Sequence, residues 1–186
     1  MKTWKIDSSH SRIQFKVKHL MVSNVSGEFT KYDGTVLSDK DDFSDAKITF
    51  EADVDSLTTG SPQRDGHLKS NDFFNAQSFP KVKFVSKELK KIDGENYKLV
   101  GDFTMRDKTL PITLDVVFGG MGTMNGMNGL HTAAGFEIKG KINRKDFGLS
   151  WNMATEAGGV VVGEEIKLDI TVELVEQKEA VKTEKA

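Results

Sequence analysis

Apolar and polar side chains alternate with a period of two along most of this chain, and no other feature constrains its fold as strongly. In residues 46–54, apolar side chains occupy every second position and charged or polar side chains stand between them. Such alternation is typical of β-strands that bury one face. The same pattern occurs in residues 13–17, 25–36, 82–84, 99–105, 110–118, 136–142 and 166–174. The sequence therefore predicts about eight strands, each with one apolar and one charged face.

The short connections between these segments indicate antiparallel neighbours. Residues 93–96, with the sequence Asp-Gly-Glu-Asn, are typical of a hairpin turn, and residues 106–108 form another short turn. Parallel strands need crossovers of about a dozen residues or more, and most of the gaps are shorter than that. A sheet with one apolar face must either curl around that face or pack it against a second layer. We therefore expect an all-β chain.

Three stretches lack the alternation. Ser61 as N-cap and Pro62 as the first helical residue predict a short helix near residues 62–72. Residues 119–129 contain five glycines and three methionines, with Met-Asn-Gly twice in tandem, and predict a mobile loop. Residues 143–163 show no clean period.

The composition argues against several classes of protein. Acidic residues number 28 and Lys plus Arg 26, and this balance argues against binding to nucleic acid. There is no cysteine, which excludes thiolate nucleophiles, disulfides and cysteine-ligated metals. No apolar run is long enough to cross a bilayer, so no integral membrane segment is expected.

The two ends of the chain predict its location and its domain boundary. Residues 1–7 become polar at once, without the apolar stretch of a secretory signal. The chain as given is therefore expected in the cytoplasm, or in the periplasm if a signal had been removed. After Val175 the sequence becomes strongly charged. This predicts one domain at residues 1–175 and a charged, disordered tail at residues 176–186.

No residue pattern typical of catalysis or metal binding occurs. The four histidines never have the His-x-x-x-His spacing, and there is no Gly-x-Ser-x-Gly sequence. We therefore expect neither a metal site nor a cofactor. Two of the four arginines, Arg64 and Arg144, lie in the irregular stretches. Arginine is preferred for buried ion pairs and for bidentate contacts with anions, so each either ties its segment to the sheet through a carboxylate or contacts a ligand.

Three sequence motifs are specific enough to compare with a known family. They are residues 4–15 (Trp-x-Ile-Asp-x-x-His-Ser-x-Ile-x-Phe), 64–68 (Arg-Asp-x-His-Leu) and 143–148 (Asn-Arg-x-Asp-Phe-Gly). Together they resemble the YceI-like family over about residues 3–175. The resemblance implies a lipocalin-like antiparallel barrel with a long apolar interior that holds a polyisoprenoid or similar lipid. Members of this family are often exported to the periplasm.

With this resemblance, the predicted fold is an all-β, eight-stranded antiparallel lipocalin-like barrel with a short helix near residues 62–72. Eight strands enclose room for side chains or for one small ligand. The inward positions Gly101, Gly140 and Ala52 are expected to leave space. The apolar side chains expected to line a ligand pocket are Ile13, Phe15, Val17, Ile48, Phe50, Phe84, Leu99, Phe103, Leu114, Val116, Phe136 and Ile138.

The expected function is non-catalytic: binding, carrying or sequestering a polyisoprenoid, an isoprenoid quinone or a fatty-acid derivative. In a helix, Arg64, His67 and Leu68 share one face. Arg64 and His67, together with Arg144, are therefore expected near the head group of the lipid. Two alternatives remain. An enzyme acting on a lipid-like substrate would need converging polar residues with perturbed pKa values, and an interaction module would have a filled interior. A homodimer is compatible with each of these.

Overall fold

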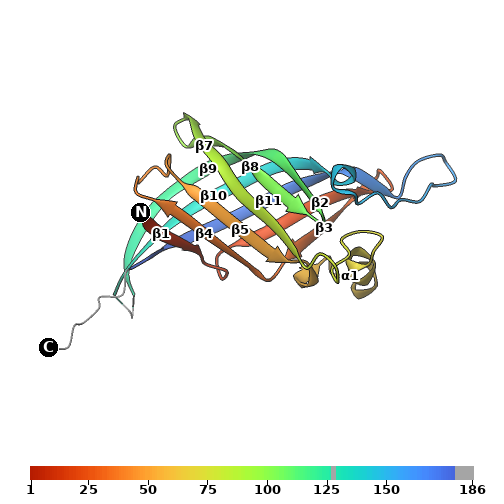
Figure 1. The fold of residues 1–186 in the computed structure, drawn as a ribbon, viewed down its shortest axis with the longest axis horizontal. Coiled ribbons are helices and arrows are strands. Elements are labelled where there is room, and N and C mark those ends of the chain that lie inside the picture. Colours follow the sequence, from red (N-terminus) through yellow and green to blue (C-terminus); the bar gives the residue numbers. More distant parts are fainter. Residues whose placement is uncertain (127–128, 179–186) are drawn as a thin grey trace.

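One antiparallel sheet closes on itself to form a barrel (Figure 1). The computed structural model describes residues 1–126 and 129–178. Its strands are β1 (Lys2–Ile6), β2 (Arg12–His19), β3 (Ser23–Phe29), β4 (Tyr32–Ser38), β5 (Lys47–Asp53), β6 (Leu57–Thr58), β7 (Lys81–Asp93), β8 (Asn96–Met105), β9 (Lys108–Gly126), β10 (Gly129–Asn143) and β11 (Val162–Gln177). The prediction of an all-β fold is confirmed.

These strands combine into eight long ones. β1 and β2 are two parts of one strand that is interrupted at residues 7–11, and β3 and β4 are two parts of the next. β5 and β6 flank the 3₁₀ turn η1 (Val54–Ser56) in the same manner. β11 pairs with β10 on one side and with both β1 and β2 on the other, which closes an eight-stranded antiparallel barrel. The predicted strand number and the antiparallel path are both confirmed.

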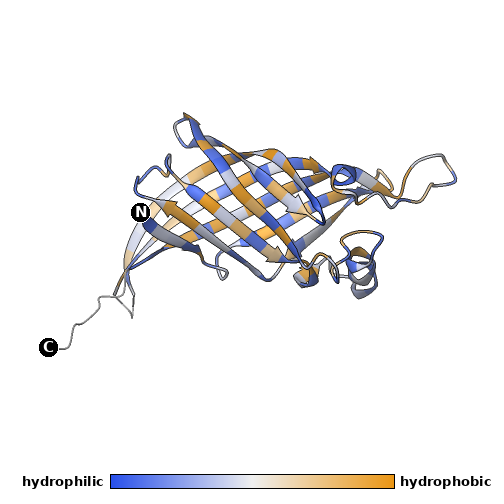
Figure 2. Cartoon of the chain, viewed as in Figure 1, coloured by the Kyte–Doolittle hydropathy of each residue, from blue (hydrophilic) through white to orange (hydrophobic). Residues whose placement is uncertain are grey.

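The period-two pattern places apolar side chains inside the barrel and charged side chains outside it. Figure 2 shows hydrophobic and hydrophilic residues alternating along the strands. In β8, for example, Tyr97 and Leu99 are buried in the interior, whereas Lys98 between them is exposed. The barrel wall is therefore a single layer with an apolar inner face.

One end of the barrel is plugged by Phe43, which lies in the segment between β4 and β5. Phe43 is only 1% exposed, and its ring centroid lies 5.0 Å from that of Trp4 and 5.1 Å from that of Phe136. The hydroxyl of Tyr97 donates a hydrogen bond to the backbone carbonyl of Asp42 (2.8 Å), which fixes the same segment. We call this the closed end.

The opposite end carries the helix α1 (Pro62–Lys69) and the segment that links η2 (Arg144–Phe147) to β11 (Figure 1). Ser61 precedes the helix and Pro62 begins it, as the sequence predicts. The helix ends at Lys69 rather than near residue 72, and a turn follows in which the Ser70 N–H bonds the carbonyl of His67 (3.1 Å). We call this the open end.

The described part of the glycine-rich stretch, residues 119–126 and 129, is strand rather than the mobile loop that its composition predicts. β9 continues to Gly126 and β10 begins at Gly129, with Met121 paired to Ala134 and Met124 to His131. The β9–β10 register shifts by one residue at a β-bulge beside Gly120. Gly120 has a φ of 99°, which glycine adopts readily. Residues 127–128 lie outside the described part of the chain, as does the predicted tail from residue 179 onward. β11 itself continues to Gln177.

The interruption between β1 and β2 holds a polar cluster. The Asp7 carboxylate accepts hydrogen bonds from the backbone N–H (2.8 Å) and the hydroxyl (2.6 Å) of Ser9. His10 Nδ1 lies 2.9 Å from Asp7 Oδ2 and 3.5 Å from Glu173 Oε1 on β11. Hydrogen bonds from Ser9 and His10 lower the pKa of Asp7 to about 2. The hydrogen bond to Asp7 and the charge of Glu173 raise the pKa of His10 above 6.5.

These pKa shifts predict opposite pH dependences for the two groups. Because the pKa of His10 is raised on folding, its contribution to stability is present below pH 6.5 and is lost as the pH rises through the folded-state value. The contribution of Asp7 is present above its ordinary pKa of 3.8 and is lost as the pH falls toward about 2. In an NMR titration, Asp7→Asn should move the midpoint of His10 downward, and an unchanged midpoint would contradict this assignment.

Candidate functional site

Two apolar cavities lie end to end inside the barrel. The outer cavity, with a volume of about 240 Å³, opens between α1, the end of β2 and the segment 149–162. The inner cavity, with a volume of about 150 Å³, continues to Phe43 at the closed end. Four residues line both cavities and form what we call the neck: Phe29, Val82, Phe103 and Leu168. A ligand longer than the outer cavity has to pass this neck.

The alternation in the sequence selects the side chains of the wall. Phe15 and Val17 line the outer cavity. The other predicted pocket residues line the inner cavity: Ile13, Ile48, Phe50, Phe84, Leu99, Phe103, Leu114, Val116, Phe136 and Ile138. Their contact with a ligand stays a prediction. The free space leaves the alternative of a filled barrel interior without support.

The inward glycines do not leave free space, contrary to the prediction. A Cβ atom at Gly101 would lie 2.3 Å from the ring of Phe84, and one at Gly140 would lie 2.3 Å from a methyl of Leu114. Ala52 is packed in the core. A large side chain from a neighbouring strand thus lies over each glycine. The glycines contribute to the cavity indirectly, because these side chains rest against the wall.

Arg144 is a buried cation at the inner side of the mouth, and only 2% of it is exposed. Its guanidinium donates to backbone carbonyl oxygens, namely those of Gly163 (2.8 Å), Trp151 (2.9 Å), Val162 (3.2 Å) and Leu149. Burial lowers the pKa of Arg144 below its ordinary value. Its partners are carbonyls rather than carboxylates, so the prediction that Arg144 pairs with a carboxylate is wrong. Arg144 still holds η2, the following segment and the start of β11 together.

Arg64 lies on α1 beside the outer cavity, where it is exposed. Its Nε donates to Thr59 Oγ1 (2.7 Å) and its Nη2 to the Thr59 carbonyl (2.9 Å). Within residues 1–126 and 129–178, no carboxylate lies within ion-pair distance of Arg64, so the ion-pair alternative is wrong here too. A guanidinium has five N–H donors, and Thr59 takes only part of this capacity.

His67 lies one helical turn further along α1 and also lines the outer cavity. Its Nε2 is 2.8 Å from Asp72 Oδ2. The ring packs edge-on against Trp151, with centroids 4.7 Å apart, and against Phe73 at 5.1 Å. The structure therefore brings the three predicted head-group residues to one mouth. Arg64 and His67 face it as accessible polar groups, whereas Arg144 is largely engaged by the backbone.

Sequence reasoning missed several residues that shape the site. Phe43 is a lone aromatic residue in the polar run 38–45, and this isolation was a usable signal for a plug. Arg106 donates from Nη1 to the carbonyls of Phe73 (3.2 Å) and Gly148 (3.0 Å), so it too braces the open end. No local pattern distinguishes Arg106 from a turn residue.

A known protein family matches nearly the whole chain. The family model of the YceI-like domain matches the sequence of residues 4–174. The chain belongs to the YceI-like family. UPF0312 proteins of Staphylococcus epidermidis and Staphylococcus aureus are 40% and 39% identical to this YceI-like protein over 173 residues, which cover 93% of this chain and 97% of each relative.

Solved structures share the fold of this YceI-like protein. A YCEI protein of Campylobacter jejuni is 34% identical and aligns with a TM-score of 0.70 over 87% of this chain and 90% of that one. Burkholderia cenocepacia BcnA aligns with a TM-score of 0.75 at 21% identity, over 90% of this chain and 98% of that one. A polyisoprenoid binding domain from Saccharophagus degradans aligns with a TM-score of 0.66 at 12% identity, over 94% and 98%. The last two likenesses concern the fold alone.

The two mouth arginines should differ in their effect on stability. Arg144→Gln leaves buried carbonyls without donors, each of which costs about 1–3 kcal/mol, so the free energy of unfolding should fall by at least about 2 kcal/mol. Arg64→Gln removes an exposed group and should change it by less than about 0.5 kcal/mol. Urea denaturation of both variants measures this difference. Equal losses would show that Arg64 also holds the fold together.

Proposed function

We propose that this YceI-like protein binds and carries one long-chain apolar lipid inside its barrel. The class includes polyisoprenoids, isoprenoid quinones and fatty-acid derivatives. The observation that carries the proposal is the apolar cavity pair, which runs from an open mouth to the Phe43 plug. Its length along the barrel and its apolar wall suit an extended hydrocarbon chain. The polyisoprenoid binding domain that shares this fold supports the same ligand class.

The polar groups are distributed unevenly along this path, which favours one orientation of the ligand. Apart from Thr35 and Thr49, the side chains around the inner cavity are apolar. The mouth instead carries Lys18, Arg64 and His67. We infer that the tail enters first and passes the neck, while the head group stays at the mouth and accepts hydrogen bonds there.

The rival function is an enzyme that acts on a lipid-like substrate at the mouth. The observation in its favour is the His67–Asp72 pair, which has the geometry of a histidine oriented by a carboxylate. The hydroxyl of Thr59 lines the same cavity, but it donates to Asp65 (2.6 Å) and accepts from Arg64. A hydroxyl engaged in this way is poorly placed to act as a nucleophile. Turnover of a prenyl or acyl substrate that disappears in His67→Ala would favour the enzyme.

The carrier function is tested directly by identifying the lipid that is bound to the purified protein. Native mass spectrometry of gently purified protein should show an added mass, and organic extraction should release a lipid with a long apolar chain. Protein stripped of this lipid should take up a quinone or a prenyl phosphate again. Preparations that are always empty and bind neither compound would overturn the proposal.

A larger side chain at the neck should weaken the binding of long ligands but not of short ones. Leu168 lines both cavities and is only half-buried, so Leu168→Trp should narrow the passage without filling the core. Affinity for a long-chain ligand should fall at least about tenfold, which corresponds to roughly 1.4 kcal/mol. Affinity for a short-chain analogue that fits the outer cavity should stay unchanged.

Leu168→Met provides the matched control, since it conserves volume. Fluorescence titration with ligands of increasing chain length measures both variants. If Leu168→Trp weakened short and long ligands equally, the chain would not cross the neck.

A further inference from the structure

Exposed apolar side chains gather on the β2–β3 turn and at the base of the hairpin 152–161, beside the mouth of the outer cavity. Leu20, Met21 and Val22 form the turn between β2 and β3 and are 43%, 59% and 80% exposed. Met153 and Val160 are exposed on the neighbouring segment 152–161. We call these five residues the rim. A cluster of large apolar side chains on the surface of a domain marks an interaction site.

The backbone holds the rim in place. The N–H of Leu20 donates to the carbonyl of Val161 (2.9 Å), and the N–H of Val161 donates to the carbonyl of Met153 (3.0 Å). Leu20 and Met21 both have positive φ values, 52° and 58°. This conformation is strained for bulky residues, and such strain is typical of functional positions. The fold thus maintains a strained turn that presents apolar side chains to the solvent.

We propose that the rim docks this protein on the surface of an anionic lipid bilayer, with the mouth of the cavity against the bilayer. The inference rests on the proposed function, because a long-chain apolar lipid resides in membranes. His19 and Val161 line the outer cavity and are direct chain neighbours of the rim, and Lys18, which precedes His19, lines it too. A bilayer in contact with the rim therefore faces the opening. Exposed apolar side chains of a docked protein enter the boundary between head groups and acyl chains.

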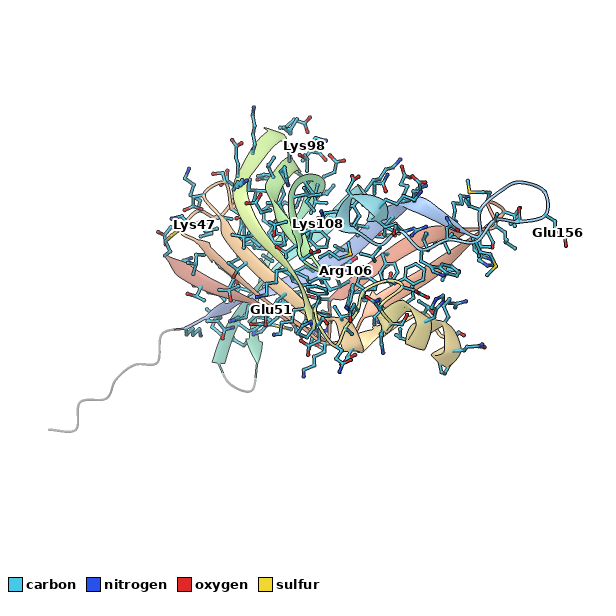
Figure 3. All side chains as sticks on the ribbon, turned by 45° about the vertical axis from the view of Figure 1, so that its right-hand side comes forward. Lys47, Glu51, Lys98, Arg106, Lys108 and Glu156 are labelled. Atoms are coloured by element: carbon cyan, nitrogen blue, oxygen red, sulfur yellow. The ribbon has the colours of Figure 1, made fainter. Side chains whose placement is uncertain are left out.

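Two basic side chains at the mouth suit an anionic surface, whereas the carboxylate of Asp65 on α1 lies close by and accepts hydrogen bonds from Thr59. Lys18 and Arg64 line the mouth, and neither has a carboxylate within ion-pair distance in residues 1–126 and 129–178. The carboxylate of Asp72 is paired with His67. Glu156 projects from the far tip of the segment 152–161 (Figure 3). Basic residues close to a membrane are attracted to anionic lipids, and Glu156 opposes this attraction.

The shape of the rim favours a bilayer over a second copy of the chain. The rim consists of five side chains, three on the β2–β3 turn and two at the base of the hairpin 152–161. A stable protein interface buries about 800 Å² per partner, which needs a broader surface. Insertion into a bilayer needs no complementary protein surface.

Vesicle binding of the full chain tests this inference. Co-sedimentation would use vesicles of phosphatidylcholine alone and of phosphatidylcholine with phosphatidylglycerol at a molar ratio of about 7:3. Wild type should bind the anionic vesicles more strongly, and salt should weaken this binding. The triple variant Leu20→Ser, Met21→Ser, Val22→Ser should lose at least about tenfold in binding. The double variant Met153→Ser, Val160→Ser tests the other part of the rim and should also bind less.

Two single substitutions sharpen the comparison. Ile92 is 52% exposed near the closed end, so Ile92→Ser removes an apolar side chain of similar size away from the rim and should leave vesicle binding unchanged. Glu156→Lys should strengthen binding to the anionic vesicles. Equal binding by wild type and the triple variant would overturn the inference, as would a loss of binding in Ile92→Ser.

Uptake of a quinone from detergent micelles tests the carrier function without a membrane, so it distinguishes the docking inference from the proposed function. Stripped wild type and the triple variant should take up a quinone equally well from micelles, and the variant should load more slowly from vesicles. If wild type loads from micelles but binds no vesicles, the docking inference fails and the carrier function stands. If it binds vesicles through the rim but loads from neither source, docking stands and the carrier function fails. A wild-type dimer that the triple variant converts to a monomer would assign the rim to contact between copies and overturn docking.

Discussion

Closure of the sheet at β11 is the constraint on which the rest of the structure depends. One strand must pair with β10 along its length and with both β1 and β2 on its other edge. From Ile6 to Arg12 the chain advances six residues, while the partner positions on β11 go from Leu174 to Thr171 and advance only three. The extra residues form the interruption at 7–11, where the Glu173 N–H donates to Ser11 Oγ (2.9 Å). Closure thus requires a local break in the strand, and the polar cluster around Asp7 occupies it.

A closed eight-stranded wall directs every second side chain inward, but this chain does not fill the space it encloses. At the closed end, Phe43 and Trp4 supply the missing volume. Toward the open end the interior stays hollow. At about 24 cal/mol per Å³, an empty inner cavity of about 150 Å³ costs roughly 4 kcal/mol of stability. Hydrogen bonds from two arginines, Arg106 and Arg144, tie the segments of the open end together and offset part of this cost.

The sequence predicted the strands because alternation is a local signal that closure leaves intact, whereas the closed barrel was implied by the resemblance to the YceI-like family. The eight segments and the inward residues such as Phe50 and Leu114 follow from the alternation. The start of the helix follows instead from Ser61 as N-cap and Pro62 as first helical residue. The glycine-rich composition gave a wrong prediction for residues 119–126, whose conformation is determined by strand pairing with β10. The partners of Arg144 could not be predicted, because backbone carbonyls carry no sequence signal. The cavity itself depends on how Phe84 lies over Gly101, which is a matter of packing between strands.

The apolar wall determines how such a carrier could exchange its ligand. Moving a hydrocarbon chain from water into the barrel gains about 0.8 kcal/mol per methylene unit, so a chain of about twenty units would gain roughly 16 kcal/mol and would almost never leave into water. Moving the same chain from a bilayer into the barrel gains little, because both environments are apolar. The tail therefore keeps the ligand out of water but does not decide between membrane and protein. How the ligand distributes between membrane and protein therefore depends on its head group and on the mouth. There, Arg64 and His67 have hydrogen-bonding capacity that the apolar wall lacks.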